Sequence, residues 1–235
     1  MQHDLPASGT QVLRGLELFS GLPEVALAEI LADAQIYELD KDTVVFRQGE
    51  CAEHCYALIT GRVRISQSDE EGEQLLVRFI SAGEMFGTVA LFTGGNYPAE
   101  GTTTLKSVIA RWPEASLLRL IERHPRIALN ILKVTGARLR EMQERLREVA
   151  TQRAHRRIAR VLLRLHAQAG QSTGSGEISF PLTRQDIAAM CGTTLHTASR
   201  VLTDWEKRGL LTTHRSHVVL RRLKDIQSIA DEPGI

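Results

Sequence analysis

The chain has 235 residues, with 29 Lys and Arg, 28 Asp and Glu, and 3 Cys. An odd, small number of thiols excludes a disulfide scaffold. The absence of an apolar run of about 18 residues, and of a charged-then-apolar leader, excludes a helical membrane span or an export signal. These features predict a cytoplasmic protein with no membrane partner.

Charge is distributed unevenly along the chain. Residues 151–235 hold 13 Lys and Arg against 7 Asp and Glu, whereas residues 1–150 hold 16 against 21. A basic C-terminal part fits contact with the phosphates of a nucleic acid, and an acidic N-terminal part does not.

The N-terminal part changes from helical to strand periodicity near Tyr37. Before that residue, apolar positions follow helical spacing, and Gly21 and Pro23 divide them into two short helices. After it, short apolar runs are separated by turn residues about every 8–12 positions. Many short strands with regular turns favour a sandwich or jelly roll. Residues 102–112 are predicted to be the last strand.

A long helix is predicted at residues 125–149. Apolar side chains recur there at alternating spacings of three and four, which is typical of a coiled-coil seam, and the other faces carry mixed charge. The pattern predicts a homodimer, and the alternative is that this face packs on the chain's own barrel. The predicted dimerisation residues are Leu132, Thr135, Leu139, Met142, Leu146 and Val149.

The next helix is predicted to be capped by Thr151, with a hinge near Ala150. Its apolar residues lead into a Gly- and Ser-rich stretch at residues 170–176. A short strand is predicted at residues 178–180.

Residues 183–209 are predicted to form two short helices joined by a tight turn. Thr183 and Asp186 match a capping box at the start of the first helix. Gly192 can take the positive φ of a sharp reversal, and Gly209 is placed to end the second helix. The predicted buried face of the second helix consists of Leu195, Ala198, Val201, Leu202 and Trp205.

The opposite face of the second helix carries short polar or cationic side chains, which suits a helix laid in the major groove of DNA. Residues 210–220 are predicted to form a two-stranded ribbon, which completes a winged helix-turn-helix. A plain helical hairpin is the alternative, but the cap, the turn and the wing agree with one another. The candidate DNA-binding residues are Thr183, Arg184, Thr194, His196, Ser199, Arg200, Thr203 and Arg215.

The order of barrel, long helix and winged helix resembles the CRP/FNR superfamily of bacterial transcription regulators. The resemblance rests on residues 45–50 (VFRQGE), 56–65 (YALITGRVRI), 83–87 (GEMFG), 91–92 (LF) and 196–200 (HTASR), the last being similar to the Glu-x-x-Ser-Arg motif of the FNR side. It implies an α+β fold with three parts. These are a cyclic-nucleotide-binding-type β jelly roll at residues 1–124, a dimerisation helix at 125–150 and a winged helix-turn-helix at 151–235.

Departures from the family's patterns bear on the signal. The cAMP-binding members carry Arg-Ser or Arg-Thr where this chain has Pro98-Ala99, so a cyclic phosphate would meet neither a guanidinium nor a hydroxyl there. A cysteine-ligated iron–sulfur cluster is not expected, because no cysteine precedes Cys51. The haem-based CO sensor has Cys and His after the glycine turn, where this chain has Gly87 and Thr88.

The chain also resembles the nitric-oxide and nitrogen-oxide regulators of the DNR and NnrR types, through residues 96–99 (NYPA) and 196–200. This resemblance implies a response to nitric oxide or a related redox or gas signal, with haem as a candidate cofactor. Candidate haem ligands are His54 and His124, with Cys51 and Cys55 as others, although a packed or solvated side chain is the simpler interpretation of each. The candidate effector pocket consists of Phe86, Thr88, Pro98 and Ala99.

As a dimer, such a protein would place two recognition helices in successive major grooves, so an inverted-repeat operator is expected. Arg200 is expected to read a guanine and Ser199 a neighbouring base or phosphate. His196 stands where FNR-type proteins have an acidic acceptor, and TTG…CAA half-sites are expected from the family alone. The predicted phosphate anchors are Thr183, Arg184, Thr194 and Arg215. The resemblance implies RNA polymerase as a further partner.

Two other functions remain as alternatives. A metal-dependent cupin enzyme needs clustered His and carboxylate ligands, whereas the predicted barrel has one central histidine, His54. A regulator of the same family with no small-molecule ligand, controlled by its abundance, is the second alternative.

Overall fold

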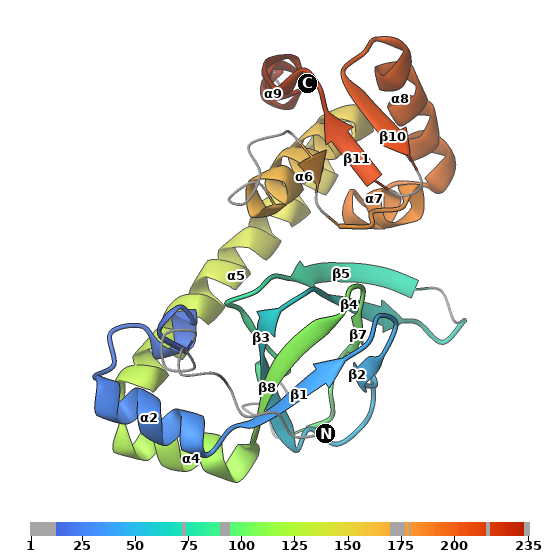
Figure 1. Ribbon diagram of the computed structural model, residues 1–235. Coiled ribbons are helices and arrows are strands. Elements are labelled where there is room, and N and C mark those ends of the chain that lie inside the picture. Colours follow the sequence, from blue (N-terminus) through green and yellow to red (C-terminus); the bar gives the residue numbers. More distant parts are fainter. Residues whose placement is uncertain are drawn as a thin grey trace. The chain divides into compact units, whose positions relative to one another are not determined.

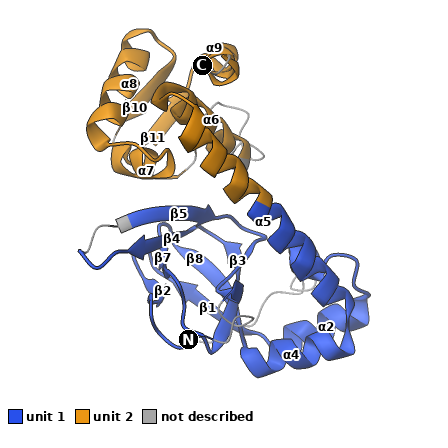
Figure 2. Ribbon diagram, turned by 180° about the vertical axis from the view of Figure 1, so that it is seen from behind, with its two compact units in different colours: residues 1–139 blue, residues 140–235 orange. Residues whose placement is uncertain are grey.

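The computed structural model describes residues 13–71, 74–89, 95–169, 177–178, 180–214 and 217–232. It divides into two compact units, Met1–Leu139 and Arg140–Ile235. The boundary lies inside one continuous helix, α5 (Arg126–Thr151), as Figures 1 and 2 show. Within the described ranges, no helix is both long and apolar enough to cross a membrane.

In the part of the chain that the structure describes, unit 1 contains two antiparallel four-stranded sheets. Their strand orders are β1-β8-β3-β6 and β2-β7-β4-β5 (Figure 1). Side chains from both sheets share one core, which confirms the predicted jelly roll. The strands are β1 (Gln35–Leu39), β2 (Val44–Phe46), β3 (His54–Thr60), β4 (Val63–Ser68), β5 (Gln74–Ile80), β6 (Met85–Phe86), β7 (Glu100–Thr103) and β8 (Ser107–Pro113).

The predicted single strand at residues 102–112 is wrong, because the chain reverses between β7 and β8 and the two strands join different sheets. Ser107 stabilises the reversal: its hydroxyl donates to the Leu105 carbonyl at 2.7 Å and accepts from the Arg62 amide at 3.2 Å. Gly61 lies against this turn with a φ of 93°, and a Cβ there would collide with the Ser107 hydroxyl. The close approach therefore requires glycine at this position.

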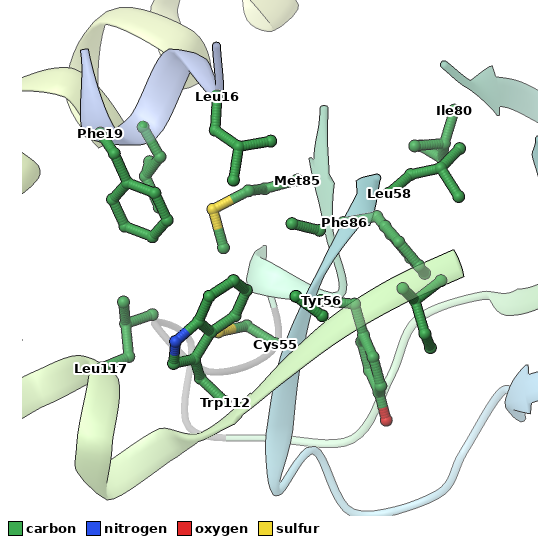
Figure 3. Close-up of a cluster of buried hydrophobic side chains, with 14 of the residues drawn as sticks. Leu16, Phe19, Cys55, Tyr56, Leu58, Ile80, Met85, Phe86, Trp112 and Leu117 are labelled. Carbon is green, nitrogen blue, oxygen red and sulfur yellow. The ribbon is translucent and has the colours of Figure 1, made fainter. Parts of the chain in front are cut away.

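Trp112 joins the barrel to the N-terminal helices η1 (Glu17–Phe19) and α2 (Glu24–Ala32). Its indole Nε1 donates to the Ile30 carbonyl at 2.8 Å, and its ring meets Phe19 edge-on with centroids 5.7 Å apart. Figure 3 shows both rings beside Leu16 and Leu117, which comes from α4 (Glu114–Arg123). Truncating a buried tryptophan costs about 3–5 kcal/mol, so this contact outweighs any single surface ion pair in fixing the helices.

Asn130 fixes the first turns of α5 to unit 1. Its buried amide Nδ2 donates to the carbonyls of Leu18 and Ser20 at 3.0 and 2.9 Å. These bonds satisfy carbonyls at the end of η1 that have no partner within that short helix.

Unit 2 has the predicted winged helix-turn-helix fold. Among the described residues of this unit, strands pair in the order β10-β11-β9. Ile158, Leu162 and Leu165 on α6 are buried and supply part of its core. The elements are α6 (Ala154–Ala169), β9 (Glu177–Ile178), α7 (Arg184–Met190), α8 (Leu195–Lys207), β10 (Leu211–His214), β11 (His217–Leu220) and α9 (Leu223–Asp231).

The predicted cap at Thr151 is wrong. Thr151 is the last residue of α5, and its hydroxyl donates to the Arg147 carbonyl one turn earlier. A threonine inside a helix satisfies its hydroxyl in this way, so it does not start α6. The helix break lies at Gln152 and Arg153, beyond the predicted hinge at Ala150.

Candidate nucleic-acid interface and effector barrel

The first helix of the motif, α7, begins at the predicted capping box. The Thr183 hydroxyl accepts from the Asp186 amide at 3.0 Å, and the Thr183 amide donates to the Asp186 carboxylate at 2.9 Å. The same hydroxyl donates to that carboxylate at 2.7 Å. Thr183 therefore uses its side-chain hydrogen bonds at the helix start.

The turn between α7 and α8 requires glycine at position 192. Gly192 has a φ of 58°, and a Cβ there would approach Val149 of α5 to 3.1 Å. Arg157 on α6 holds the turn, because its guanidinium donates to the carbonyls of Cys191 at 2.7 Å and Gly192 at 3.1 Å. A third bond runs to the Gln152 carbonyl at 2.5 Å, so one side chain ties the turn to the end of α5.

The second helix, α8, buries one face and exposes the other. Ala198, Leu202 and Trp205 are buried, while His196 and Arg200 are exposed. Within the part of the chain that the structure describes, neither exposed side chain has a hydrogen-bond partner, so both are free to meet a base edge. The prediction for Leu195 is wrong, because at the first turn of α8 this side chain is 47% exposed.

Four other predicted DNA-binding residues have partners inside the domain or lie outside the described residues. The Thr194 hydroxyl caps α8 by accepting from the Thr197 amide at 3.2 Å. Arg184 donates to the Thr203 hydroxyl at 3.1 Å and to the Glu206 carboxylate at 3.1 Å. On the wing, β10 pairs with β11 from Leu211 opposite Leu220 to His214 opposite His217. Arg215 lies outside the described residues.

Four aromatic rings pack together inside the barrel of unit 1. Phe46 stacks on Tyr97 with centroids 4.2 Å apart and on Tyr56 at 5.5 Å, and Tyr56 stacks on Phe86 at 5.3 Å. All four side chains are buried. Only Phe86 is among the residues predicted from the sequence to line a pocket. The others come from strands and loops far apart along the chain, so periodicity alone carries no signal that they meet.

The other predicted pocket residues differ in how far they are buried. Ala99 is buried, Pro98 is exposed, and Thr88 is partly buried just after the Gly87 turn. The Pro98 carbonyl accepts from the Gln67 side chain at 2.9 Å. Neither Pro98 nor Ala99 offers a cation or a side-chain donor for a phosphate.

Two family models match this chain. The cyclic nucleotide-binding domain model matches residues 17–124, and the Crp-like helix-turn-helix domain model matches residues 156–229. The chain belongs to the CRP/FNR family of transcription regulators.

This CRP/FNR regulator is similar over most of its length to the Cyclic AMP receptor protein of Thermus thermophilus, with 28% identity covering 93% of this chain and 98% of the relative. The solved sensor domain of the transcriptional regulator DNR from Pseudomonas aeruginosa is 31% identical, with a TM-score of 0.52, over 57% of this chain and 91% of that chain. FixK2 from Bradyrhizobium japonicum shares the fold, with a TM-score of 0.74 and 22% identity over 85% of this chain and 98% of that chain. DNR and other relatives are named transcriptional regulators, and this chain is a regulator rather than an enzyme.

The predicted dimer seam of the regulator is open in the single chain. Its four largest apolar side chains are between 57% and 71% exposed, and Val149 is 48% exposed. An apolar stripe of this length on a charged helix is typical of a surface that a second helix covers. The four are Leu132, Leu139, Met142 and Leu146.

The described residues of the regulator do not fit a haem. The His124 imidazole Nε2 lies 3.0 Å from the Glu29 carboxylate, beside Arg123, in a polar cluster of α2 and α4. The hydrogen bond from His124 lowers the pKa of Glu29. Burial, and then the charge of Arg111, lower the pKa of His54 and so favour its neutral ring. The His54 ring centroid lies 6.4 Å from that of Tyr56, which stacks on Phe86 within the packed ring cluster.

The cysteines of the regulator are no better suited as ligands. Burial raises the pKa of the Cys55 thiol and of the Cys191 thiol to about 12, so both stay protonated at neutral pH. Cys51 is exposed on an isolated bridge opposite Asn96. Within the described ranges, no group of three or more His, Cys, Asp and Glu side chains is placed to hold a metal ion.

The two buried thiols give a direct prediction about alkylation. At pH 8, a thiol with a pKa near 12 is a thiolate in only about one molecule in ten thousand, so iodoacetamide should modify Cys51 alone in the native protein. Intact-mass measurement should show one adduct in buffer and three in concentrated guanidinium chloride. A second adduct formed at the rate of the first would contradict the burial of Cys55 and Cys191.

Proposed function

We propose that this chain is a homodimeric, sequence-specific DNA-binding regulator that reads an inverted-repeat operator with α8. The observation that carries the proposal is the two-sided helix: Ala198, Leu202 and Trp205 are buried, and His196 and Arg200 project from the exposed side. Helix-turn-helix proteins read base edges with a second helix of this kind, placed in the major groove.

Arg200 is proposed to read a guanine, because a guanidinium matches the O6 and N7 acceptors of that base in a bidentate contact. Ser199 is placed one residue before it and is partly buried, so a neighbouring base or a phosphate suits its hydroxyl. His196 is proposed to alter preference at one base pair, since it stands where the FNR side has an acidic acceptor. Thr183, Thr194 and Arg215 are proposed as phosphate contacts, of smaller weight for the two threonines because their hydroxyls already serve caps.

The dimer is proposed to form along the open seam of α5. Two recognition helices about one helical turn apart then give the operator its symmetry. RNA polymerase is proposed as a further partner from the function of the family, with no residue assigned to it.

We also propose that the barrel responds to nitric oxide or a related redox or gas signal rather than to cAMP. The absence of a phosphate-binding pair at Pro98-Ala99 argues against cAMP, although the Thermus thermophilus relative is named a cyclic AMP receptor. The likeness to the DNR sensor domain and to the nitrogen-oxide regulators supports the signal. The proposal assigns no ligand to a haem, because neither His54 nor His124 fits one.

A regulator without any small-molecule ligand is the second candidate function. One observation favours it: the rings of Phe46, Tyr56, Phe86 and Tyr97 are buried and pack against one another inside the barrel. Binding a ligand there would require at least one ring to move out of a close-packed core.

Removing the side chain that is proposed to read a base should lower the affinity for DNA and reduce the preference for the operator sequence. Arg200→Ala is expected to lower affinity for the preferred operator by about 1–3 kcal/mol and to abolish preference at one base pair of each half-site. Fluorescence anisotropy on a set of single-base-pair variants of a duplex selected from a random library measures both effects. The control is Arg208→Ala, which removes an exposed arginine at the other end of α8 that pairs with Asp204. Equal weakening on every sequence would exclude Arg200 as a reader.

Placing a charge in the seam should separate the subunits. Leu139→Glu places like charges against each other where the two helices of the dimer would meet. Sedimentation should therefore show a monomer. This monomer should bind a half-site duplex no more weakly than the full palindrome. Leu118→Glu, on an exposed leucine of α4 outside the seam, is the matched control and should remain dimeric. A dimer that persists in the Leu139 variant would place the interface elsewhere.

An absorption spectrum separates the two proposed modes of control. The purified chain is titrated with haem and then exposed to nitric oxide under anaerobic conditions. A stoichiometric Soret band that shifts with nitric oxide, and a change in operator affinity, support the gas-sensing function. Operator affinity that nitric oxide leaves unchanged, whether or not haem is added, supports control by abundance.

A further inference from the structure

The carboxylate of Glu206, on the last turns of α8, joins three elements of the winged helix. One oxygen accepts from the Arg184 guanidinium of α7 at 3.1 Å. The other accepts from the Thr213 amide of β10 at 3.2 Å and from the Thr213 hydroxyl. The Glu206 side chain is 27% exposed, so these charge-assisted bonds are partly shielded from water and stronger than those of a surface pair.

Arg184 extends this set of hydrogen bonds toward the DNA-facing side of α8. Its second terminal nitrogen donates to the Thr203 hydroxyl at 3.1 Å and approaches the Ser199 carbonyl at 3.5 Å. A continuous path of hydrogen bonds thus runs from the wing, through Glu206 and Arg184, to two of the proposed DNA-contacting residues of α8.

The neighbouring acid on α8 has no such role. Among the described residues, Asp204 pairs only with Arg208, one turn further along the same helix, at 3.4 Å, and both side chains are more than half exposed. Such an exposed pair adds little to the stability of the helix and constrains no other element. The two acids therefore offer a matched comparison within one helix.

We propose that Glu206 is a positioning residue for DNA recognition, fixing the wing and α7 against the recognition helix. The proposal rests on the DNA-reading function given above. Because a base contact made from a displaced element loses most of its selectivity, discrimination between operators and the wing's phosphate contacts both depend on this carboxylate.

Three substitutions separate the roles of these hydrogen bonds. Glu206→Gln keeps an acceptor for Thr213 but replaces the acceptor facing Arg184 with a neutral amide. Glu206→Ala removes both acceptors, and Thr213→Val removes the hydroxyl while leaving the amide bond. Asp204→Asn makes the same change of charge as Glu206→Gln on the same helix and is the control.

Affinity is measured by anisotropy for the duplex that the wild-type chain selects from a random library and for a scrambled duplex, over a series of salt concentrations. For Glu206→Gln the ratio of the two affinities should fall about tenfold, as expected for the loss of one charge-assisted hydrogen bond, and for Glu206→Ala it should fall further. The salt slope is the steepness with which the logarithm of the affinity falls with the logarithm of the salt concentration. It should decrease by about one for each phosphate that the displaced wing no longer reaches. Asp204→Asn should raise both affinities together and leave the ratio and the slope unchanged.

Thermal unfolding shows whether each variant is folded. Wild-type ratio and slope in both folded Glu206 variants would overturn the proposal. If neither Glu206 variant folds, Thr213→Val decides: losing one of the two hydrogen bonds by which Glu206 holds β10 should lower both the affinity ratio and the salt slope, and wild-type values of both would overturn the proposal. A wild-type chain that selects no duplex from the library would instead refute the DNA-reading function itself, so the two failures are distinguishable.

Discussion

Arginines of α6 attach the last turns of α5 to the winged helix and hold the turn between α7 and α8. Arg160 and Arg164 both donate to the buried Glu148 carboxylate at 3.2 Å, while Arg157 holds the carbonyls of the helix-turn-helix turn. Because the carboxylate is only 7% exposed, losing one partner would leave a charge with poor access to water. These hydrogen bonds therefore connect the C-terminal end of α5 to the turn that precedes α8, within one compact unit.

The barrel and the reading helix place different demands on their residues. In unit 2, exposed side chains on α8 are presented by a framework whose own polar groups are satisfied by caps and by Arg184. In unit 1, stacked aromatic rings are buried inside the barrel. Pro98 and Ala99 provide neither a guanidinium nor a hydroxyl there. The proposed DNA contacts of α8 thus use side chains that are already exposed, whereas an effector bound among the packed rings would require those rings to rearrange. That difference is why a ligand-free regulator stands beside the gas sensor as a candidate function.

Features set by local spacing were predictable from the sequence. The capping box of Thr183 and Asp186, the positive φ of Gly192 and the alternation of the barrel strands each depend on residues within a few positions of one another. Predictions from local patterns were wrong where a residue bonds to a partner that lies outside the pattern. Thr151 bonds back into α5 instead of capping α6, and the stretch predicted as one strand divides because Ser107 and Gly61, far apart in the chain, stabilise a reversal.

The sequence by itself determined the family and the order of the two units. It also determined the amphipathic seam and the helix that is the candidate reader of DNA. Each of these depends on motifs or on periodicity among residues close together in the chain. Only the tertiary structure decided which side chains meet across the chain. It brought Phe46 to Tyr97 inside the barrel, and it brought Arg184 and Thr213 to opposite oxygens of Glu206. The physical reason is that a side chain's partners depend on how elements pack, and identical local patterns permit many packings.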